Sequence, residues 1–184
     1  MTATQNNSMR VMSSSKDMTW ATPLRKAFSH DRVETGKEEW LTPPEIIKAL
    51  GPFDLDPCAP INLPWPTAEN HYTIEDNGLI KPWHGRVWLN PPYGGETGKW
   101  MRRMKDHGNG IVLIFARTET QTFHECVWGV ADAVLWIKGR LTFCNVDGTK
   151  PKNSGGAPSV LIAYGKDNAD RLRACGITGR VTAA

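Results

Sequence analysis

Five short segments rich in apolar residues predict β-strands, and stretches with helical spacing lie between several of them. The predicted strands are Phe53–Asp56, Arg86–Leu89, Gly110–Phe115, Ala133–Ile137 and Ser159–Tyr164. The run from Gly110 to Phe115 is continuously apolar and too short for a typical helix, as expected of a strand buried on both faces.

Three helices are predicted between these segments. The first follows Thr42, a favourable N-cap residue with prolines in the first turn and Glu45 three residues on, as in a capping box, and it ends at Gly51-Pro52. The second covers Gly98–His107 with Trp100, Met101 and Met104 on one face, and the third covers Thr122–Val130. Strands alternating with helices predict an α/β three-layer sandwich with a mostly parallel sheet.

The first part of the chain differs in composition. Residues 1–36 are rich in Ser, Thr and Asn with little apolar periodicity, which predicts a flexible N-terminal tail. The remaining residues, 37–184, have a suitable length for one domain with a sizeable core.

Charge and cysteine content narrow the class of protein only slightly. The net charge of +3 is compatible with a nucleic-acid partner but does not require one. The four cysteines are scattered, without a pair or a histidine at metal-binding spacing, so we expect reduced thiols and no metal site. No apolar run suits a signal peptide or a membrane span, so we expect a cytoplasmic protein.

The strongest chemical signal is Asn90-Pro91-Pro92-Tyr93, directly after a predicted strand. Ligands bind at the carboxyl ends of strands in α/β sheets, which favours a functional interpretation over a rigid proline turn. The four residues resemble the catalytic motif of amino-group methyltransferases, in which Asp, Asn or Ser precedes two prolines and an aromatic residue.

Each position of this motif has a chemical reason. The Asn90 side-chain oxygen and the Pro91 carbonyl can accept both N–H bonds of a target amino group, which frees its lone pair for a methyl group. The prolines stiffen the backbone and remove competing N–H groups. Tyr93 offers a face on which an extruded base can stack.

Two upstream segments resemble further motifs of N6-adenine methyltransferases. Trp40–Ile47 resembles the segment that contacts the methionine end of the cofactor, which implies contacts from Thr42 and Pro43. Phe53–Ala59 resembles the cofactor motif, which implies that Asp56, Pro57, Cys58 and Ala59 line the cofactor site. The glycines usual after this turn are replaced by Pro60 and Ile61.

A third segment, Glu75–Leu79, resembles the site of the acid that binds the cofactor's adenine amino group. This implies a contact from Asp76, although an Asp-Asn-Gly turn explains the same residues. The ribose carboxylate has no clear candidate beyond Glu69.

Together these motifs resemble the small phage-type (Dam-like) DNA N6-adenine methyltransferases. The resemblance implies a Rossmann-like class I methyltransferase fold, S-adenosylmethionine as cofactor and double-stranded DNA as partner, in a bacterium or phage-infected cell with or without a partner restriction enzyme. Oligomeric state is not encoded in any motif.

The flipped target base that such an enzyme needs suggests further substrate contacts. Tyr93, Arg117 at a strand end and Phe143 are the candidates, although Phe143 also suits a core position. The polar, glycine-rich segment 145–157 suits either a mobile loop that touches phosphates or a solvated hairpin. The basic residues Arg102, Arg103 and Lys105 suit either phosphate contacts or an exposed helix face, and we prefer the exposed face.

Three alternatives use the same residues. Cytosine N4 methyltransferases share the chemistry but usually carry Ser in place of Asn90, and protein-glutamine methyltransferases share the Asn-Pro-Pro-Tyr motif. A non-catalytic DNA-binding decoy on the same fold would not need the intact motif.

Overall fold

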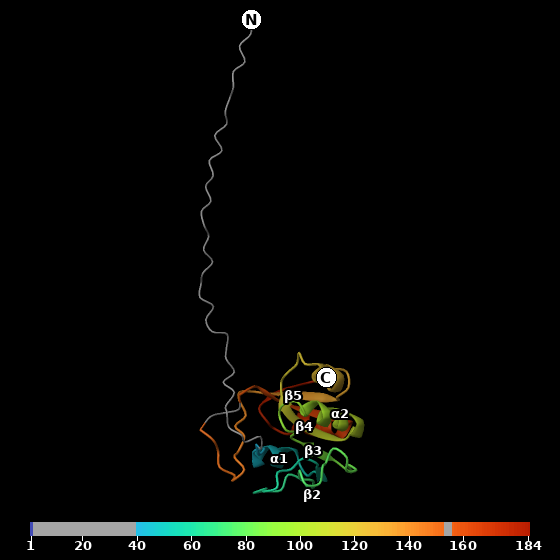
Figure 1. Cartoon of the computed structure of the whole chain (residues 1–184), viewed down its shortest axis with the longest axis vertical. Helices are drawn as coiled ribbons and strands as arrows, with labels where there is room; N and C mark the ends of the chain where they lie inside the picture. The colour runs from blue at the N-terminus through green and yellow to red at the C-terminus, as the bar shows by residue number, and fades with distance from the viewer. Residues whose placement is uncertain (2–39, 153–155) are drawn as a thin grey trace. The chain divides into compact units, whose positions relative to one another are not determined.

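The computed structural model describes residue 1, residues 40–152 and residues 156–184. The described elements include one seven-stranded sheet in the order β2-β1-β3-β4-β6-β5-β7. Figure 1 shows the labelled strands β2, β3, β4 and β5 following one another across this part of the molecule. The strands are β1 (Leu55–Asp56), β2 (Asn70–His71), β3 (Val87–Leu89), β4 (Gly110–Phe115), β5 (Ala133–Ile137), β6 (Ser159–Tyr164) and β7 (Gly179–Thr182). The helices are α1 (Pro44–Leu50), α2 (Thr97–His107), α3 (Gln121–Cys126) and α4 (Lys166–Ala174).

The prediction of an α/β fold is confirmed, whereas the prediction of a mostly parallel sheet is wrong. Strand β1 pairs in parallel with β2 and β3, and β3 pairs in parallel with β4. The other three pairings, β4–β6, β5–β6 and β5–β7, are antiparallel and longer. Because β6 is antiparallel to both of its neighbours, β5 nevertheless points in the same direction as β4. An apolar run looks alike in either direction, so the sequence pattern could not reveal the reversal of β6.

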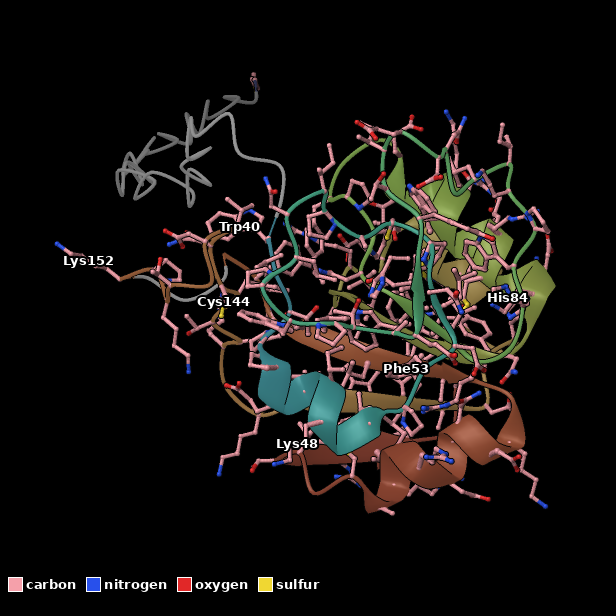
Figure 2. The ribbon with its side chains drawn as sticks, turned by 90° about the horizontal axis from the view of Figure 1, so that it is seen from below. Trp40, Lys48, Phe53, His84, Cys144 and Lys152 are labelled. Carbon is pink, nitrogen blue, oxygen red and sulfur yellow. The ribbon has the colours of Figure 1, made fainter. Side chains whose placement is uncertain are left out.

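Helices cover both faces of the sheet, as the three-layer prediction requires. On one face, α2 and α3 contribute Trp100, Met101, Met104 and Phe123 to the core. On the other face, α1 and α4 contribute Ile46, Leu50, Ala169 and Leu172. Figure 2 shows α1, marked by Lys48, and α4 together on one side of the sheet.

The predicted strands Gly110–Phe115, Ala133–Ile137 and Ser159–Tyr164 match the structure, and the other two are shorter than predicted. Helix α2 begins one residue before its predicted start, and α3 ends at Cys126 rather than Val130. The predicted capping box at α1 is wrong. The N-cap residue is Pro43, without a side-chain bond, because helix formation starts at Pro44 and leaves Thr42 outside the helix.

Three elements carry too little apolar pattern to be predicted: the polar pair Asn70–His71 in β2, helix α4 and the final strand β7. The tail expected at residues 1–36 lies outside the described residues apart from Met1, so it stays a prediction. The described helices are all too short, or too polar, to pass through a lipid bilayer.

Candidate active site

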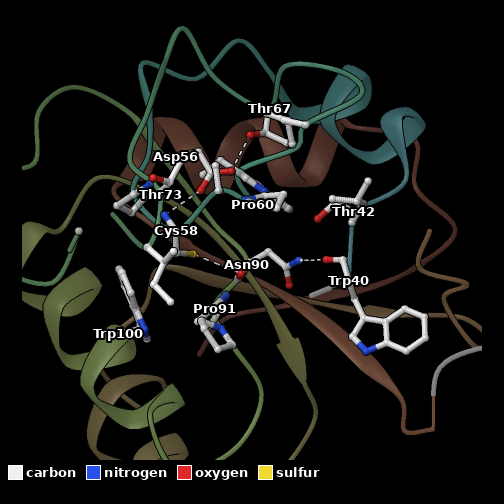
Figure 3. A pocket seen from close by; sticks show the side chains of 18 of the residues that line it. Trp40, Thr42, Asp56, Cys58, Pro60, Thr67, Thr73, Asn90, Pro91 and Trp100 are labelled. Atoms are coloured by element: carbon white, nitrogen blue, oxygen red, sulfur yellow. Dashed lines mark hydrogen bonds between the residues drawn. The ribbon is translucent and has the colours of Figure 1, made fainter. Parts of the chain in front are cut away.

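A pocket of about 450 Å³ lies where the parallel strands β1 and β3 end. Its walls come from the segment before α1, from the turns after β1 and β3, and from the loop after β2. Figure 3 shows Trp40, Thr42, Asp56, Cys58 and Asn90 around it. The full lining comprises Trp40, Leu41, Thr42, Asp56, Pro57, Cys58, Ala59, Pro60, Leu63, Trp65, Thr67, Thr73, Ile74, Asn77, Gly78, Trp88, Asn90, Pro91, Pro92, Tyr93 and Trp100.

The acid of the pocket is Asp56, the last residue of β1, which is 4% exposed. Its Oδ2 accepts a hydrogen bond from the Thr67 hydroxyl at 2.5 Å, and its Oδ1 accepts one from the Cys58 backbone N–H at 3.1 Å. Burial raises the pKa of the Asp56 carboxyl to about 6, although both hydrogen bonds lower it. A buried carboxylate is costly in free energy unless it is paired with an opposite charge, so Asp56 would be stabilised by a cationic group in the pocket.

His71 in β2 supports this acid indirectly. Its Nε2 accepts hydrogen bonds from the backbone N–H groups of Thr67 and Ala68, both at 3.3 Å. Burial lowers the pKa of the His71 imidazole, which keeps Nε2 free to accept. The neutral ring therefore holds the backbone whose Thr67 side chain binds Asp56.

Asn90 follows β3 and is held in one orientation. Its Nδ2 donates to the Trp40 carbonyl at 3.1 Å, and since a carbonyl only accepts, the NH₂ end must face Trp40. The Tyr93 hydroxyl donates to Oδ1 over a long 3.4 Å, and the Cys58 thiol donates to the Asn90 backbone carbonyl at 3.3 Å. The side-chain oxygen is thus turned away from Trp40 and only weakly engaged.

Thr42 contributes a hydroxyl to the same pocket. Thr42 is 3% exposed, and its Oγ1 has no hydrogen-bond partner among the described residues. Figure 3 shows this oxygen on the side facing Pro60 and Asn90. The Thr42 carbonyl accepts the Trp65 indole N–H at 3.2 Å, which fixes the segment before α1. A buried hydroxyl without a partner is a feature that a polar ligand can satisfy.

Tyr93 lies in an aromatic cluster beside the pocket. Its ring stacks on Phe115 at the end of β4, with ring centroids 4.2 Å apart, and meets the edge of Phe143 at 5.9 Å. Phe143 is 4% exposed and belongs to the core beneath α1. The core position that the sequence left open for Phe143 is therefore the observed one, and Phe115 covers a face of Tyr93.

The loop after β2 forms another wall, with Asn77 and Gly78 in the lining. Asp76 lies outside the lining: its carboxylate accepts hydrogen bonds from the Thr73 backbone N–H at 2.9 Å and from Lys81 at 3.2 Å. These bonds lower the pKa of the Asp76 carboxyl. A β-carbon at Gly78 would overlap the Pro57 carbonyl oxygen, so this loop approaches the turn after β1 as closely as glycine allows.

The remaining predicted contacts lie away from the lining. Pro43 is buried at the start of α1, and Arg117 is an exposed residue after β4 whose carbonyl accepts from Thr120. Arg102 pairs with Glu125 on the exposed side of α2, as expected of a solvated helix face. Lys150 of the segment 145–157 pairs with Glu45, and residues 153–155 of that segment lie outside the described residues, so the choice between a phosphate-contacting loop and a solvated hairpin stays open.

Several residues that line or support the pocket were not predicted, namely Trp40, whose carbonyl orients Asn90, the lining residues Trp65 and Thr67, and His71 behind Thr67. Their roles depend on backbone carbonyls and on a polar strand, which leave no motif, although Trp40 adjoins a segment that the sequence did single out. Among residues 1, 40–152 and 156–184, no cluster of His, Cys, Asp and Glu could hold a metal ion.

Comparison with known proteins identifies the family of the chain. No curated protein and no solved structure matches the chain. A family model described as "DNA N-6-adenine-methyltransferase (Dam)" matches residues 29–174, which include every residue that lines the pocket. The chain therefore belongs to the Dam family of DNA N6-adenine methyltransferases and is an enzyme of that class.

Proposed function

We propose that this enzyme transfers the methyl group of S-adenosylmethionine to the N6 amino group of an adenine in double-stranded DNA, with Asn90 as the central catalytic residue. The observation that carries this proposal is the orientation of the Asn90 side chain. Its NH₂ end is bound to Trp40, and its oxygen accepts only a long hydrogen bond from the Tyr93 hydroxyl, so this oxygen can also accept from a ligand in the pocket.

The orientation matters because an adenine amino group is a poor nucleophile. Its lone pair is delocalised into the ring until both N–H bonds find acceptors. The Asn90 Oδ1 and the Pro91 carbonyl are two oxygens beside the same turn, and Pro91 has no N–H that could compete. Acceptance of both hydrogens localises the lone pair on the nitrogen, and this interaction is strongest as the new bond forms.

The pocket fits the proposed cofactor in size and in polar groups. Its volume of about 450 Å³ lies within the range of small-molecule sites. Asp56 would hold the methionine ammonium, and the unpartnered Thr42 hydroxyl would bond to the methionine end. S-Adenosylmethionine supplies a methyl group on a sulfonium centre. Asn77 and Gly78 would border the adenine, with Asp76 supporting their turn from outside.

We further propose that the sheet is a variant of the Rossmann-like methyltransferase architecture and that the target base is flipped out of the duplex. Both ideas are supported by the pocket's position at strand carboxyl ends and by Tyr93 at its edge. The base would stack on a part of Tyr93 that Phe115 leaves uncovered. Exposed Arg117 and Lys152 are candidates for phosphate contacts, which supply affinity without sequence preference.

The family match favours adenine over cytosine, protein glutamine or a decoy function. The test is transfer of labelled methyl groups from S-adenosylmethionine to duplex DNA, single-stranded DNA and protein. We expect label in duplex DNA, at adenine N6 after nucleoside analysis. Label confined to protein or to cytosine would refute the proposal.

Asn90→Ala is expected to lower the transfer rate by on the order of a hundredfold or more, while the affinity for cofactor changes little. Asn109→Ala is a matched control, because the Asn109 amide also donates to a backbone carbonyl, that of Gly85, but lies before β4 and far from the strand ends that form the pocket. Equal rates in the two variants would show that Asn90 has no part in the chemistry.

A further inference from the structure

The Cys58 thiol joins two turns at the point where their strands separate. The parallel strands β1 and β3 share a single registered pair, Leu55 with Val87. Three residues after each member of this pair, beyond the ends of both strands, the Cys58 Sγ donates to the Asn90 carbonyl at 3.3 Å (Figure 3). The side chain therefore bridges the turn after β1 and the turn after β3, beyond the last backbone pairing of the two strands.

The acceptor of this bond is an unusual peptide group. The Asn90 carbonyl belongs to the bond with Pro91, which lacks an N–H, so the oxygen is the one hydrogen-bonding group of that peptide. The Asn90 side chain and the Pro91 carbonyl lie on either side of it along the chain. Rotation of this peptide plane would move both proposed acceptors, so a donor that holds its oxygen also holds their directions.

We propose that Cys58 is a positioning residue for Asn90, in which the thiol holds the Asn90–Pro91 peptide so that both oxygen acceptors face the target amino group. The inference rests on the catalytic role proposed above for Asn90. Cys58 itself contacts neither the target base nor the transferred methyl group in this role.

The Cys58 thiol stays protonated, so it can always donate its hydrogen bond. Burial and the neighbouring Asp56 carboxylate raise the pKa of the Cys58 thiol well above its ordinary value. The S–H therefore persists over the range of pH in which enzymes of this kind are assayed. A thiolate would instead repel the carbonyl oxygen.

The competing explanation is that Cys58 serves as a small packing residue in the pocket wall. Serine and alanine separate the two, because serine keeps a donor at nearly the same volume and alanine removes the donor. Cys175→Ala is the matched control. The Cys175 thiol also donates to a backbone carbonyl, that of Leu172 at 3.1 Å, but at the C-terminal end of helix α4.

The experiment measures kcat, KM for DNA, cofactor affinity and melting temperature for Cys58→Ala, Cys58→Ser, Cys175→Ala and Asn90→Ala. We expect Cys58→Ala to lower kcat by roughly three- to tenfold, the effect of one lost hydrogen bond, with cofactor affinity within about twofold of the wild type. Cys58→Ser should restore most of kcat, and Cys175→Ala should leave kcat unchanged.

Wild-type kcat in folded Cys58→Ala would overturn the inference, as would a loss of kcat in Cys58→Ser equal to that in Cys58→Ala. A loss confined to cofactor affinity would assign Cys58 to the pocket wall and overturn it as well. If Asn90→Ala keeps wild-type activity, the proposed function itself fails and the inference fails with it. A large loss in Asn90→Ala alone would leave the proposed function standing and reject only the role of Cys58.

Discussion

The two halves of the sheet divide stability and chemistry between them. The parallel strands β1, β2 and β3 have two or three residues each, and polar groups crowd their ends. The antiparallel strands β5 and β6 have five and six residues, and β6 is buried along its whole length. Short strands end early enough to leave room for a pocket, and the long apolar strands compensate for the buried polar groups that a pocket needs.

The largest expected effect comes from the antiparallel half. Leu161 is fully buried in β6, so Leu161→Ala is expected to lower the free energy of unfolding by about 2–5 kcal/mol. Urea denaturation followed by fluorescence measures this loss. The folded variant should keep wild-type cofactor affinity at low temperature. A selective loss of affinity without destabilisation would break the proposed division between the halves.

Asp56→Asn is expected to do the reverse of Leu161→Ala: it should increase stability at neutral pH and weaken cofactor binding. The pKa of the Asp56 carboxyl is raised from 3.8 to about 6, so its ionisation destabilises the folded state. This destabilisation is absent below pH 3.8, grows as pH rises towards 6 and reaches at most about 3 kcal/mol above that.

Asp56→Asn is therefore expected to raise the melting temperature at pH 7.5 and to weaken cofactor binding. Denaturation of both proteins at several pH values measures the difference, which should vanish near pH 4. A variant less stable than the wild type at pH 7.5 would show that Asp56 is structural.

Thr67→Val tests whether the Thr67 hydroxyl stabilises the ionised Asp56 carboxylate. It removes the Thr67 hydroxyl bond to Asp56, worth about 1–3 kcal/mol for a charged acceptor. Without that donor the pKa of the Asp56 carboxyl rises further, so the pH below which cofactor affinity declines should move upward. Calorimetric titration with cofactor across pH 5–8 measures the shift. In an Asp56→Asn background the substitution should have a much smaller effect.

The smallest expected effect compares two tryptophans. Trp65→Phe removes the indole bond to the Thr42 carbonyl, and Trp136→Phe removes the indole bond to the Thr182 hydroxyl in the antiparallel half. Each should reduce stability by about 0.5–1.5 kcal/mol. Only Trp65→Phe should also weaken cofactor binding, because Thr42 lines the pocket. Equal cofactor affinity in the two variants would show that the Trp65 indole bond does not support cofactor binding.

Much of the fold could be predicted because apolar runs reveal buried strands. The run at Gly110–Phe115 predicted β4 at its observed bounds, and the acid after Leu55 and the asparagine after Leu89 located two strand ends. Strand β2 could not be predicted, since Asn70 and His71 are both polar and a two-residue strand leaves no apolar pattern. The reversal of β6 depends on how the chain returns to the sheet, which its own residues do not encode.

The sequence also located the segments of the candidate site, but not the individual contacts within it. The segments around Thr42, Asp56 and Asn90 do meet in one pocket, although their individual roles stay predictions. The sequence could not reveal that the Trp40 carbonyl orients Asn90, because any residue supplies such an oxygen. Asp76 lies outside the lining because its carboxylate is bonded within its own turn, and Arg117 is an exposed residue after β4.

The outer strands of the sheet have a consequence for how the enzyme behaves at high concentration. An exposed strand edge offers unpaired backbone groups to other chains and can seed aggregates. One edge here is β2, with two polar residues, and the other is β7, which starts with Gly179 and the exposed Arg180. Neither edge offers a neighbouring molecule a long apolar strand to pair with. The apolar strands β4, β5 and β6 lie inside the sheet, where their backbone groups are already paired.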